Sequence, residues 1–245
     1  MSQAPLLGES RFWTRPEDRQ RAVTALFDRG AAHYDRVCGV MSFGSGQRYR
    51  RRALVKAGLK AGAHVLDVGT GTGLLARETA RTIDGRGRVV GVDPSLGMMR
   101  AGRERSNIPL VQGVGESLPF QSGTFDFVTM GYALRHVSDL GAAFGEYRRV
   151  LKPEGCVVLL EITKPDSAVA GAAARCYFGT IVPLLARVTT GSGDAARMMD
   201  FYWETIDRCV APAVVMRSLA DAGFADVRRD VEAGIFSAYV GRGVR

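Results

Sequence analysis

The sequence has no long hydrophobic run. Its longest apolar stretches, such as Val157–Leu160 and Ile181–Ala186, are short, whereas a helix that crosses a bilayer needs about 20 apolar residues. Residues Met1–Ser10 also lack the basic stretch followed by an apolar run that marks a secretory signal. We therefore expect a cytoplasmic protein.

Cysteine and histidine are scarce, and their spacing indicates no metal. None of the four cysteines forms a C-x-x-C motif, so neither a zinc site nor a redox pair is predicted. Two of the three histidines, His33 and His64, have no companion ligand in the sequence and are expected to be structural. The cysteines are Cys38, Cys156, Cys176 and Cys209.

Lysine is rare, although the chain is basic. Arginine supplies all but four of the 33 basic residues, and the net charge is +8. Eleven basic and five acidic residues lie within residues 1–56, with the densest run at Arg48–Lys56. No recognition helix or RNA-binding motif accompanies this run, so no nucleic-acid partner is expected. A solvated helix face is favoured, and attraction to anionic lipid headgroups is the alternative.

From Lys60 onward, short β-branched runs alternate with helical periodicity, which predicts a mainly parallel sheet with helices on both faces. The predicted helices are Leu74–Ile83, a helix capped by Ser95, and Leu140–Leu151, which Lys152–Gly155 should end. The predicted strands are Val65–Gly69, Arg88–Asp93, Leu110–Val114, Phe125–Met130 and Cys156–Ile162.

The alternation ends after Thr163. Residues 164–210 are helix-prone and rich in large apolar side chains, which suits either a lid over an apolar ligand or a homodimer face. A helix at Pro212–Ala222 and a hairpin of Val227–Val231 with Phe236–Val240 complete the sheet. We expect one α/β domain over residues 1–245, with a helical arm (1–56), a core (57–162), a helical insertion (163–210) and the end of the core (211–245).

A glycine-rich loop, Asp67–Gly73, follows the first predicted strand. Glycines let backbone amides approach a ligand, and the following helix N-terminus favours an anionic group. The pattern Gly71-x-Gly73-x-x-Ala76, with Asp93 twenty residues after Gly73, also fits a dinucleotide-binding fingerprint. The loop alone therefore leaves two ligand classes open.

Asp67 favours S-adenosylmethionine over a dinucleotide. A carboxylate at the strand tip disfavours a pyrophosphate but suits a ligand with an ammonium group and a sulfonium. Asp93 could accept hydrogen bonds from ribose hydroxyls, while Val114, Gly115 and Glu116 could meet an adenine edge. The placement of these residues at strand ends argues against a ligand-free turn whose acids only cap helices.

Several stretches resemble a known family, the class I S-adenosylmethionine-dependent methyltransferases, and within it the ubiquinone/menaquinone biosynthesis C-methyltransferases. The resemblance covers residues 24–242. It implies a Rossmann-like fold of seven strands that ends in an antiparallel hairpin. The matching stretches are Phe27-Asp28, Ala31–Asp35, Met41–Gly44, Asp67–Gly73, Glu116–Phe120, Leu134-Arg135, Arg149–Pro153, Leu160-Glu161 and Lys164-Pro165.

The resemblance implies cofactor contacts from Gly69, Thr72, Asp93, the pair Val114 and Gly115, and Gly131. Aromatic faces attract a sulfonium, so Tyr34, Phe43 and Tyr132 are expected either to face it or to fill the core. The full set expected to bind S-adenosylmethionine is Tyr34, Asp67, Gly69, Thr70, Gly71, Thr72, Gly73, Asp93, Pro94, Met98, Val114, Gly115, Glu116, Met130 and Gly131.

Two departures from the family pattern lie where the acceptor should bind. Val37–Gly39 replaces the usual Met-Asn-Asp, and Tyr132–His136 replaces Phe-Gly-Leu-Arg-Asn. The resemblance implies a small apolar quinol as acceptor, and peripheral association with the inner membrane face if that quinol is membrane-bound. Another aromatic or polyketide acceptor stays open. A nicotinamide-dependent oxidoreductase is a remote alternative that Asp67 and the terminal hairpin oppose.

His136 and Arg135 are the candidate catalytic residues. A neutral histidine at the end of the fourth strand could act as general base, and Arg135 could stabilise a developing phenolate. The alternatives are that Arg135 pairs with a helix carboxylate and that His136 caps the following turn.

Overall fold

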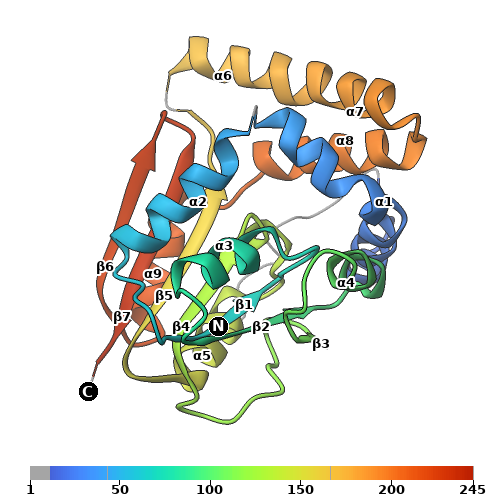
Figure 1. The fold of residues 1–245 in the computed structure, drawn as a ribbon. Helices are drawn as coiled ribbons and strands as arrows, with labels where there is room; N and C mark the ends of the chain where they lie inside the picture. The colour runs from blue at the N-terminus through green and yellow to red at the C-terminus, as the bar shows by residue number, and fades with distance from the viewer. Residues whose placement is uncertain (1–11, 43, 166, 245) are drawn as a thin grey trace.

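The computed structural model describes residues 12–42, 44–165 and 167–244. A seven-stranded sheet with the order β3-β2-β1-β4-β5-β7-β6 forms its centre (Figure 1). Neighbours from β3 to β5 are parallel, whereas β7 pairs antiparallel with both β5 and β6. The predicted C-terminal hairpin is confirmed. The strands are β1 (His64–Val68), β2 (Arg88–Asp93), β3 (Leu110–Gln112), β4 (Phe125–Gly131), β5 (Leu151–Ile162), β6 (Phe224–Glu232) and β7 (Phe236–Gly243).

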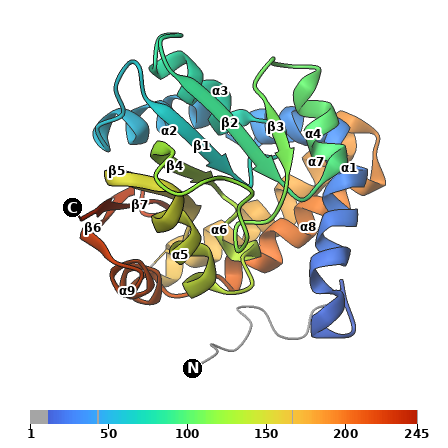
Figure 2. The ribbon, with the colours of Figure 1, turned by 90° about the horizontal axis from the view of Figure 1, so that it is seen from below.

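Helices cover both faces of the sheet, as predicted (Figure 2). Successive side chains of β5 lie on opposite faces of the sheet. Val158 and Leu160 belong to the hydrophobic core that includes residues of α2 and α8, whereas Val157 and Leu159 belong to the core that includes residues of α5 and α9. Strands buried on both sides explain the unbroken apolar runs in the sequence. The helices are α1 (Arg19–Met41), α2 (Ser45–Lys56), α3 (Leu74–Thr82), α4 (Leu96–Arg103), α5 (Leu140–Val150), α6 (Ala168–Cys176), α7 (Val182–Thr190), α8 (Gly193–Asp207) and α9 (Pro212–Asp221), with short helical turns η1 (Pro16–Asp18), η2 (Leu134–His136) and η3 (Tyr177–Ile181).

Local signals place most helix starts correctly. The Ser95 hydroxyl accepts a hydrogen bond from the Met98 amide at the start of α4, as predicted. The end of α5 differs from prediction. Lys152–Gly155 were expected to end the helix and precede the strand, but they belong to β5, which begins at Leu151 directly after α5. Leu151 pairs with Phe125 of β4. A register shift between Phe125 and Phe127 accommodates this extension.

Residues Ala168–Thr190 form a continuous helical stretch through α6, η3 and α7. By length and apolar composition this is the one stretch of the described residues that could cross a membrane, although the sequence runs suggested none. Phe178, Val182 and Ala186 are buried on one side of it, against the side of α1 and α8. The other side is exposed and apolar, with Leu184 60% and Val188 73% exposed. Length and composition alone do not make it a transmembrane helix.

Candidate active site

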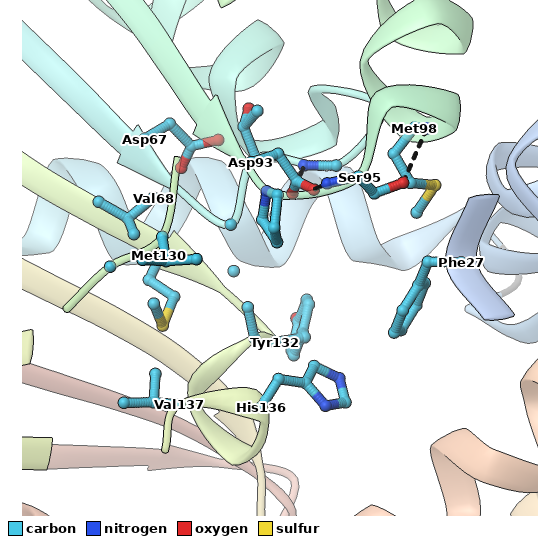
Figure 3. A pocket seen from close by; sticks show the side chains of 18 of the residues that line it. Phe27, Asp67, Val68, Asp93, Ser95, Met98, Met130, Tyr132, His136 and Val137 are labelled. Carbon is cyan, nitrogen blue, oxygen red and sulfur yellow. Dashed lines mark hydrogen bonds between the residues drawn. The ribbon is translucent and has the colours of Figure 1, made fainter. Parts of the chain in front are cut away.

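A pocket lies where β1, β2 and β4 end, beside the point at which the strand order reverses between β1 and β4. Open α/β sheets bind ligands at this place because loops from both directions leave a crevice there. Helix α1 and Tyr202 of α8 complete the wall. Figure 3 shows Asp67 and Asp93 on one side of the pocket and Tyr132 and His136 on the other.

Gly69 shapes the loop between β1 and α3. Its φ of +63° lies in the left-handed region, and a methyl group added there would lie 2.7 Å from the Cβ atom of Ala133. Gly71 is also left-handed, and its amide donates to the Asp93 carboxylate at 2.7 Å. Both positions favour glycine because a side chain would be strained at a positive φ, and at Gly69 it would also collide with Ala133.

Asp67 is a buried carboxyl group with one unused oxygen. Its Oδ1 accepts a hydrogen bond from the Thr129 hydroxyl at 2.7 Å, whereas Oδ2 has no partner in the described part of the chain. Burial raises the pKa of Asp67 to about 6, while the hydrogen bond from Thr129 opposes the shift. A buried oxygen without a partner at a pocket wall indicates a ligand that donates to it.

Asp93 is held by the backbone around it. Its two oxygens accept from the amides of Gly71 and Ser95, and burial raises its pKa to about 6 against those bonds. Glu116 also lines the pocket and accepts from the Ser138 amide, just after the η2 turn, at 2.6 Å. Asp67 and Asp93 make their half of the pocket suitable for ammonium, sulfonium and hydroxyl groups.

Most of the residues expected to bind the cofactor do line the pocket. Two do not: the Thr72 hydroxyl donates to Asp35, and Gly73 serves as N-cap of α3. Thr72 is turned away because Asp35 and Arg77 form an ion-paired cluster with it behind the loop. The lining residues among those expected are Tyr34, Asp67, Gly69, Thr70, Gly71, Asp93, Pro94, Met98, Val114, Gly115, Glu116, Met130 and Gly131.

The opposite half of the pocket is aromatic. Phe27 and Tyr34 of α1, Tyr132 after β4 and Tyr202 of α8 line it. Tyr34 and Tyr132 therefore stand where an aromatic face was expected; Phe43, the third expected aromatic, falls outside the described residues. The pocket thus joins an acidic half to an aromatic one.

His136 lines the aromatic half. Its ring stacks on Phe201 at 5.5 Å and meets Phe27 edge-on at 5.3 Å. Burial, then Arg135 and Arg19, lower its pKa well below the ordinary value, so the ring is neutral near pH 7. Neither ring nitrogen has a partner among the described residues, so His136 does not cap a turn.

Arg135 does not line the pocket, contrary to its expected contact with the acceptor. It is 1% exposed, forms a buried ion pair with Glu161 of β5, and its guanidinium lies 4.0 Å from the centre of the Tyr202 ring. Burial alone would lower the pKa of Arg135, but Glu161 raises it, so the guanidinium stays charged. The alternative expectation was that Arg135 pairs with a carboxylate on a helix. Arg135 does pair with a carboxylate, but that of Glu161, which lies on a strand.

Sequence reasoning missed Arg50, which lines the aromatic half of the pocket. Arg50 belongs to the basic run on α2 that was predicted to face solvent. The helical spacing could have predicted that Arg50 faces inward, since Arg50 lies three and four residues before the buried Ala53 and Leu54. Elsewhere in the run, Arg52 and Lys56 pair with Glu232 and Asp230 of β6.

Comparison with known proteins identifies the family. The ubiE/COQ5 methyltransferase family matches residues 15–242. The chain belongs to this family. It is 34% identical over 220 residues to the demethylmenaquinone methyltransferase of Symbiobacterium thermophilum, covering 86% of this chain and 88% of the relative. It is 33% identical over 189 residues to the ubiquinone/menaquinone biosynthesis C-methyltransferase UbiE of Hahella chejuensis, covering 74% and 76%.

Solved structures confirm the expected Rossmann-like fold. A methyltransferase of Thermotoga maritima, titled a possible histamine N-methyltransferase, superposes with a TM-score of 0.63 at 20% identity, over 90% of this chain and 99% of that one. An S-adenosylmethionine-dependent methyltransferase of Aquifex aeolicus gives 0.59 at 21% identity, over 80% and 89%. These neighbours establish the fold, and the family establishes the activity: the chain is an S-adenosylmethionine-dependent methyltransferase.

The pocket fits that donor. The free Oδ2 of Asp67 would accept from its ammonium group, and Asp93 would hold ribose hydroxyls beside the Gly71 amide. Val114, Gly115 and Glu116 line the same pocket and would meet its adenine edge. A donor with one ammonium and one sulfonium is the kind of ligand that Asp67 and Asp93 favour.

Proposed function

We propose that this enzyme methylates a ring carbon of a quinol of the ubiquinone or menaquinone type. The observation that carries the proposal is the division of one pocket into an acidic half for the donor and an aromatic half for a flat apolar acceptor, in a chain whose relatives are named for these reactions. The aromatic half offers Phe27, Tyr34, Tyr132 and Tyr202 as surfaces for an aromatic ring.

We infer that His136 is the general base. Bound S-adenosylmethionine supplies an electrophilic methyl group, and transfer leaves the electron pair of the broken S–CH3 bond on sulfur. The acceptor gains the methyl and loses one proton, which the unpaired nitrogen of neutral His136 accepts. Arg135, paired with Glu161 beneath the site, positions the η2 turn that carries His136.

A methylation assay with isotopically labelled donor tests the proposed acceptor. The panel holds reduced short-chain demethylmenaquinone, the same quinone left oxidised, a simple phenol and a polyketide phenol. We expect label in the reduced quinone and none in the oxidised one, because only reduction makes its ring electron-rich enough to attack the methyl group. The rings of the two phenols are also electron-rich, so absence of label in them would show that the pocket selects the quinol by shape. Label in the polyketide or simple phenol and none in the quinol would contradict the proposal.

We also propose that the exposed face of the helical stretch Ala168–Thr190 rests on an anionic membrane surface of the cytoplasm. This face presents Val169, Leu184 and Val188 to solvent, and the stretch has Arg175 and Arg187 but no acidic residue. Apolar residues flanked by arginine favour an interfacial position along a bilayer of anionic lipid. Burial of Phe178 and Val182 against the enzyme argues for a helix lying on the membrane rather than crossing it.

Co-sedimentation with phosphatidylglycerol vesicles tests this orientation. We expect Leu184→Glu combined with Val188→Glu to abolish binding, and Val55→Glu, an exposed apolar position on α2, to leave it intact. Binding should weaken between low salt and about 0.5 M salt. No vesicle binding, together with a dimer in solution that Leu184→Glu dissociates, would show that the face joins two subunits instead.

A further inference from the structure

Arg50 is a buried cation in the wall of the active-site pocket. It extends from α2 and is only 8% exposed, yet it contributes to the pocket lining. A guanidinium keeps its charge at all physiological pH values. Burying such a charge is costly unless an anion or a set of hydrogen-bond acceptors compensates for it.

The described part of the chain supplies no anion to Arg50. Within the described residues its guanidinium forms no ion pair and no hydrogen bond, whereas the other two buried arginines have polar partners: Arg135 binds Glu161, and Arg19 donates to the Arg135 carbonyl at 3.0 Å. The side chains with the largest electrostatic effect on the pKa of Arg50 are phenols and a thiol, and they raise it while burial lowers it. They are Tyr132, Cys38, Tyr34 and Tyr202.

The surroundings hold the guanidinium in place. It lies 5.2 Å from the centre of the Tyr132 ring, a distance at which an aromatic face attracts a cation. Tyr132 itself has a φ of +60°, a conformation that is strained for a bulky residue, and its amide donates to the Leu160 carbonyl at 2.7 Å. Gly46 leaves room for Arg50, because a Cβ atom there would stand 2.9 Å from Nη1.

We infer that Arg50 is the anion-binding residue of this pocket and that its N–H groups donate to an oxyanion of a bound substrate. The inference rests on the proposed function, which names two molecules that carry an oxyanion. The methyl donor has a carboxylate, and the acceptor forms a phenolate. The acidic half of the pocket repels both groups. Among the described residues that line the pocket, Arg50 is the one arginine or lysine, so either group would bind there.

Calorimetric titration of two nucleosides distinguishes these sources. S-adenosylhomocysteine has the carboxylate, whereas 5′-methylthioadenosine has the same adenosine part without the amino acid. If Arg50 binds the donor carboxylate, Arg50→Met weakens S-adenosylhomocysteine binding by about tenfold or more and leaves 5′-methylthioadenosine binding unchanged. If Arg50 binds the acceptor, both nucleosides bind as in the wild type and kcat/KM for the quinol falls by about tenfold or more, with partial recovery in Arg50→Lys.

Arg51→Met is the matched control, because Arg51 is exposed on the same helix. Equal nucleoside affinities and equal kcat/KM in Arg50→Met and Arg51→Met would overturn the inference. Should Arg50→Met fail to fold, Arg50→Gln keeps much of the volume and an N–H donor without the charge, and the same comparisons decide. A wild-type protein that methylates no quinol would refute the proposed function instead, and the nucleoside titrations would still report on Arg50.

Discussion

Asp67 and Asp93 make donor binding sensitive to pH. Burial raises the pKa of both carboxyl groups to about 6 in the free protein, so each is largely protonated at pH 5. An ammonium beside Asp67 stabilises its charged form, and binding at low pH must therefore release a proton. The same shift makes the free energy of unfolding of the free protein fall as pH rises from the ordinary aspartate pKa to about 6.

We expect the affinity for S-adenosylhomocysteine to decrease below pH 6, by up to about tenfold per pH unit for each carboxyl group that must ionise. Calorimetry in buffers of different ionisation enthalpy would count the protons released. Asp67→Asn should bind weakly at pH 8 and show a shallower dependence on pH. A wild-type affinity that stays constant from pH 8 to pH 5 would contradict the assignment.

His136→Ala should lower turnover by about 10²–10⁴ and change S-adenosylhomocysteine affinity little, because the ring faces the acceptor half of the pocket. Rapid-quench kinetics and calorimetry measure the two quantities. His33→Ala is the control, since His33 lies on α1 outside the pocket lining. Turnover in His136→Ala that matches the wild type from pH 5 to pH 8 would remove His136 from the chemistry.

Glu161→Ala should lower the free energy of unfolding by about 3–5 kcal/mol, because it leaves the Arg135 charge buried and unpaired. Denaturant unfolding measures this, with Glu104→Ala at an exposed site as control. Removing both charges in Arg135→Met with Glu161→Met should recover part of the loss. A Glu161→Ala loss no larger than that of Glu104→Ala would mean that the pair does not hold η2 in place.

At the scale of secondary structure, most strands and helices of the core were predictable from the sequence because each follows from a local pattern. The strand Arg88–Asp93 and the Ser95 cap needed only β-branched runs and a hydroxyl before a helix. The start of β5 was not predictable in this way, since Leu151 becomes a strand residue only by pairing with Phe125. Pairing between distant segments is invisible to local propensity.

The site shows the same limit for individual side chains. Glycines and acids at strand ends were predictable because topology brings strand ends together. The directions of Arg50 and Arg135 depended instead on which carboxylates lay nearby: Glu161 draws Arg135 away from the pocket, while no acid draws Arg50 out of it. From the sequence, a charged residue on a strand-end turn or in a basic helix can therefore be assigned to a part of the fold, but the group that it contacts cannot be predicted.

The loop Asp67–Gly73 offers an element-scale test. Gly69→Ala and Gly85→Ala both place a side chain at a positive φ, but only the first meets a neighbour, at Ala133. We expect Gly85→Ala to lower the free energy of unfolding by about 1–2 kcal/mol and Gly69→Ala to lower it further because of its collision with Ala133. Only Gly69→Ala should lose S-adenosylhomocysteine affinity. Equal affinity in the two variants would show that the loop does not shape the donor site.

At the scale of the whole molecule, the described part of the helical arm (residues 12–42 and 44–56) packs into the enzyme and supplies part of its pocket. Its helices α1 and α2 supply Tyr34 and Arg50 to the pocket, and Arg52 and Lys56 are neutralised by acids of β6. The proposed membrane face lies instead on the stretch Ala168–Thr190, where an apolar surface and two arginines stand together. The chain thus brings a donor site, an acceptor site and a proposed bilayer contact into one unit.

Carbon methylation of a quinol is the central claim, and the structure of the product tests it most directly. Anaerobic incubation with reduced demethylmenaquinone and donor carrying a ¹³C-labelled methyl group, followed by NMR of the extracted product, locates the new methyl group. We predict a ¹³C resonance of a methyl bonded to a ring carbon, and a signal about tenfold weaker in Arg50→Met after the same incubation time if Arg50 binds the phenolate. A methyl bonded to oxygen, or no labelled product from a protein that binds S-adenosylhomocysteine, would contradict the account.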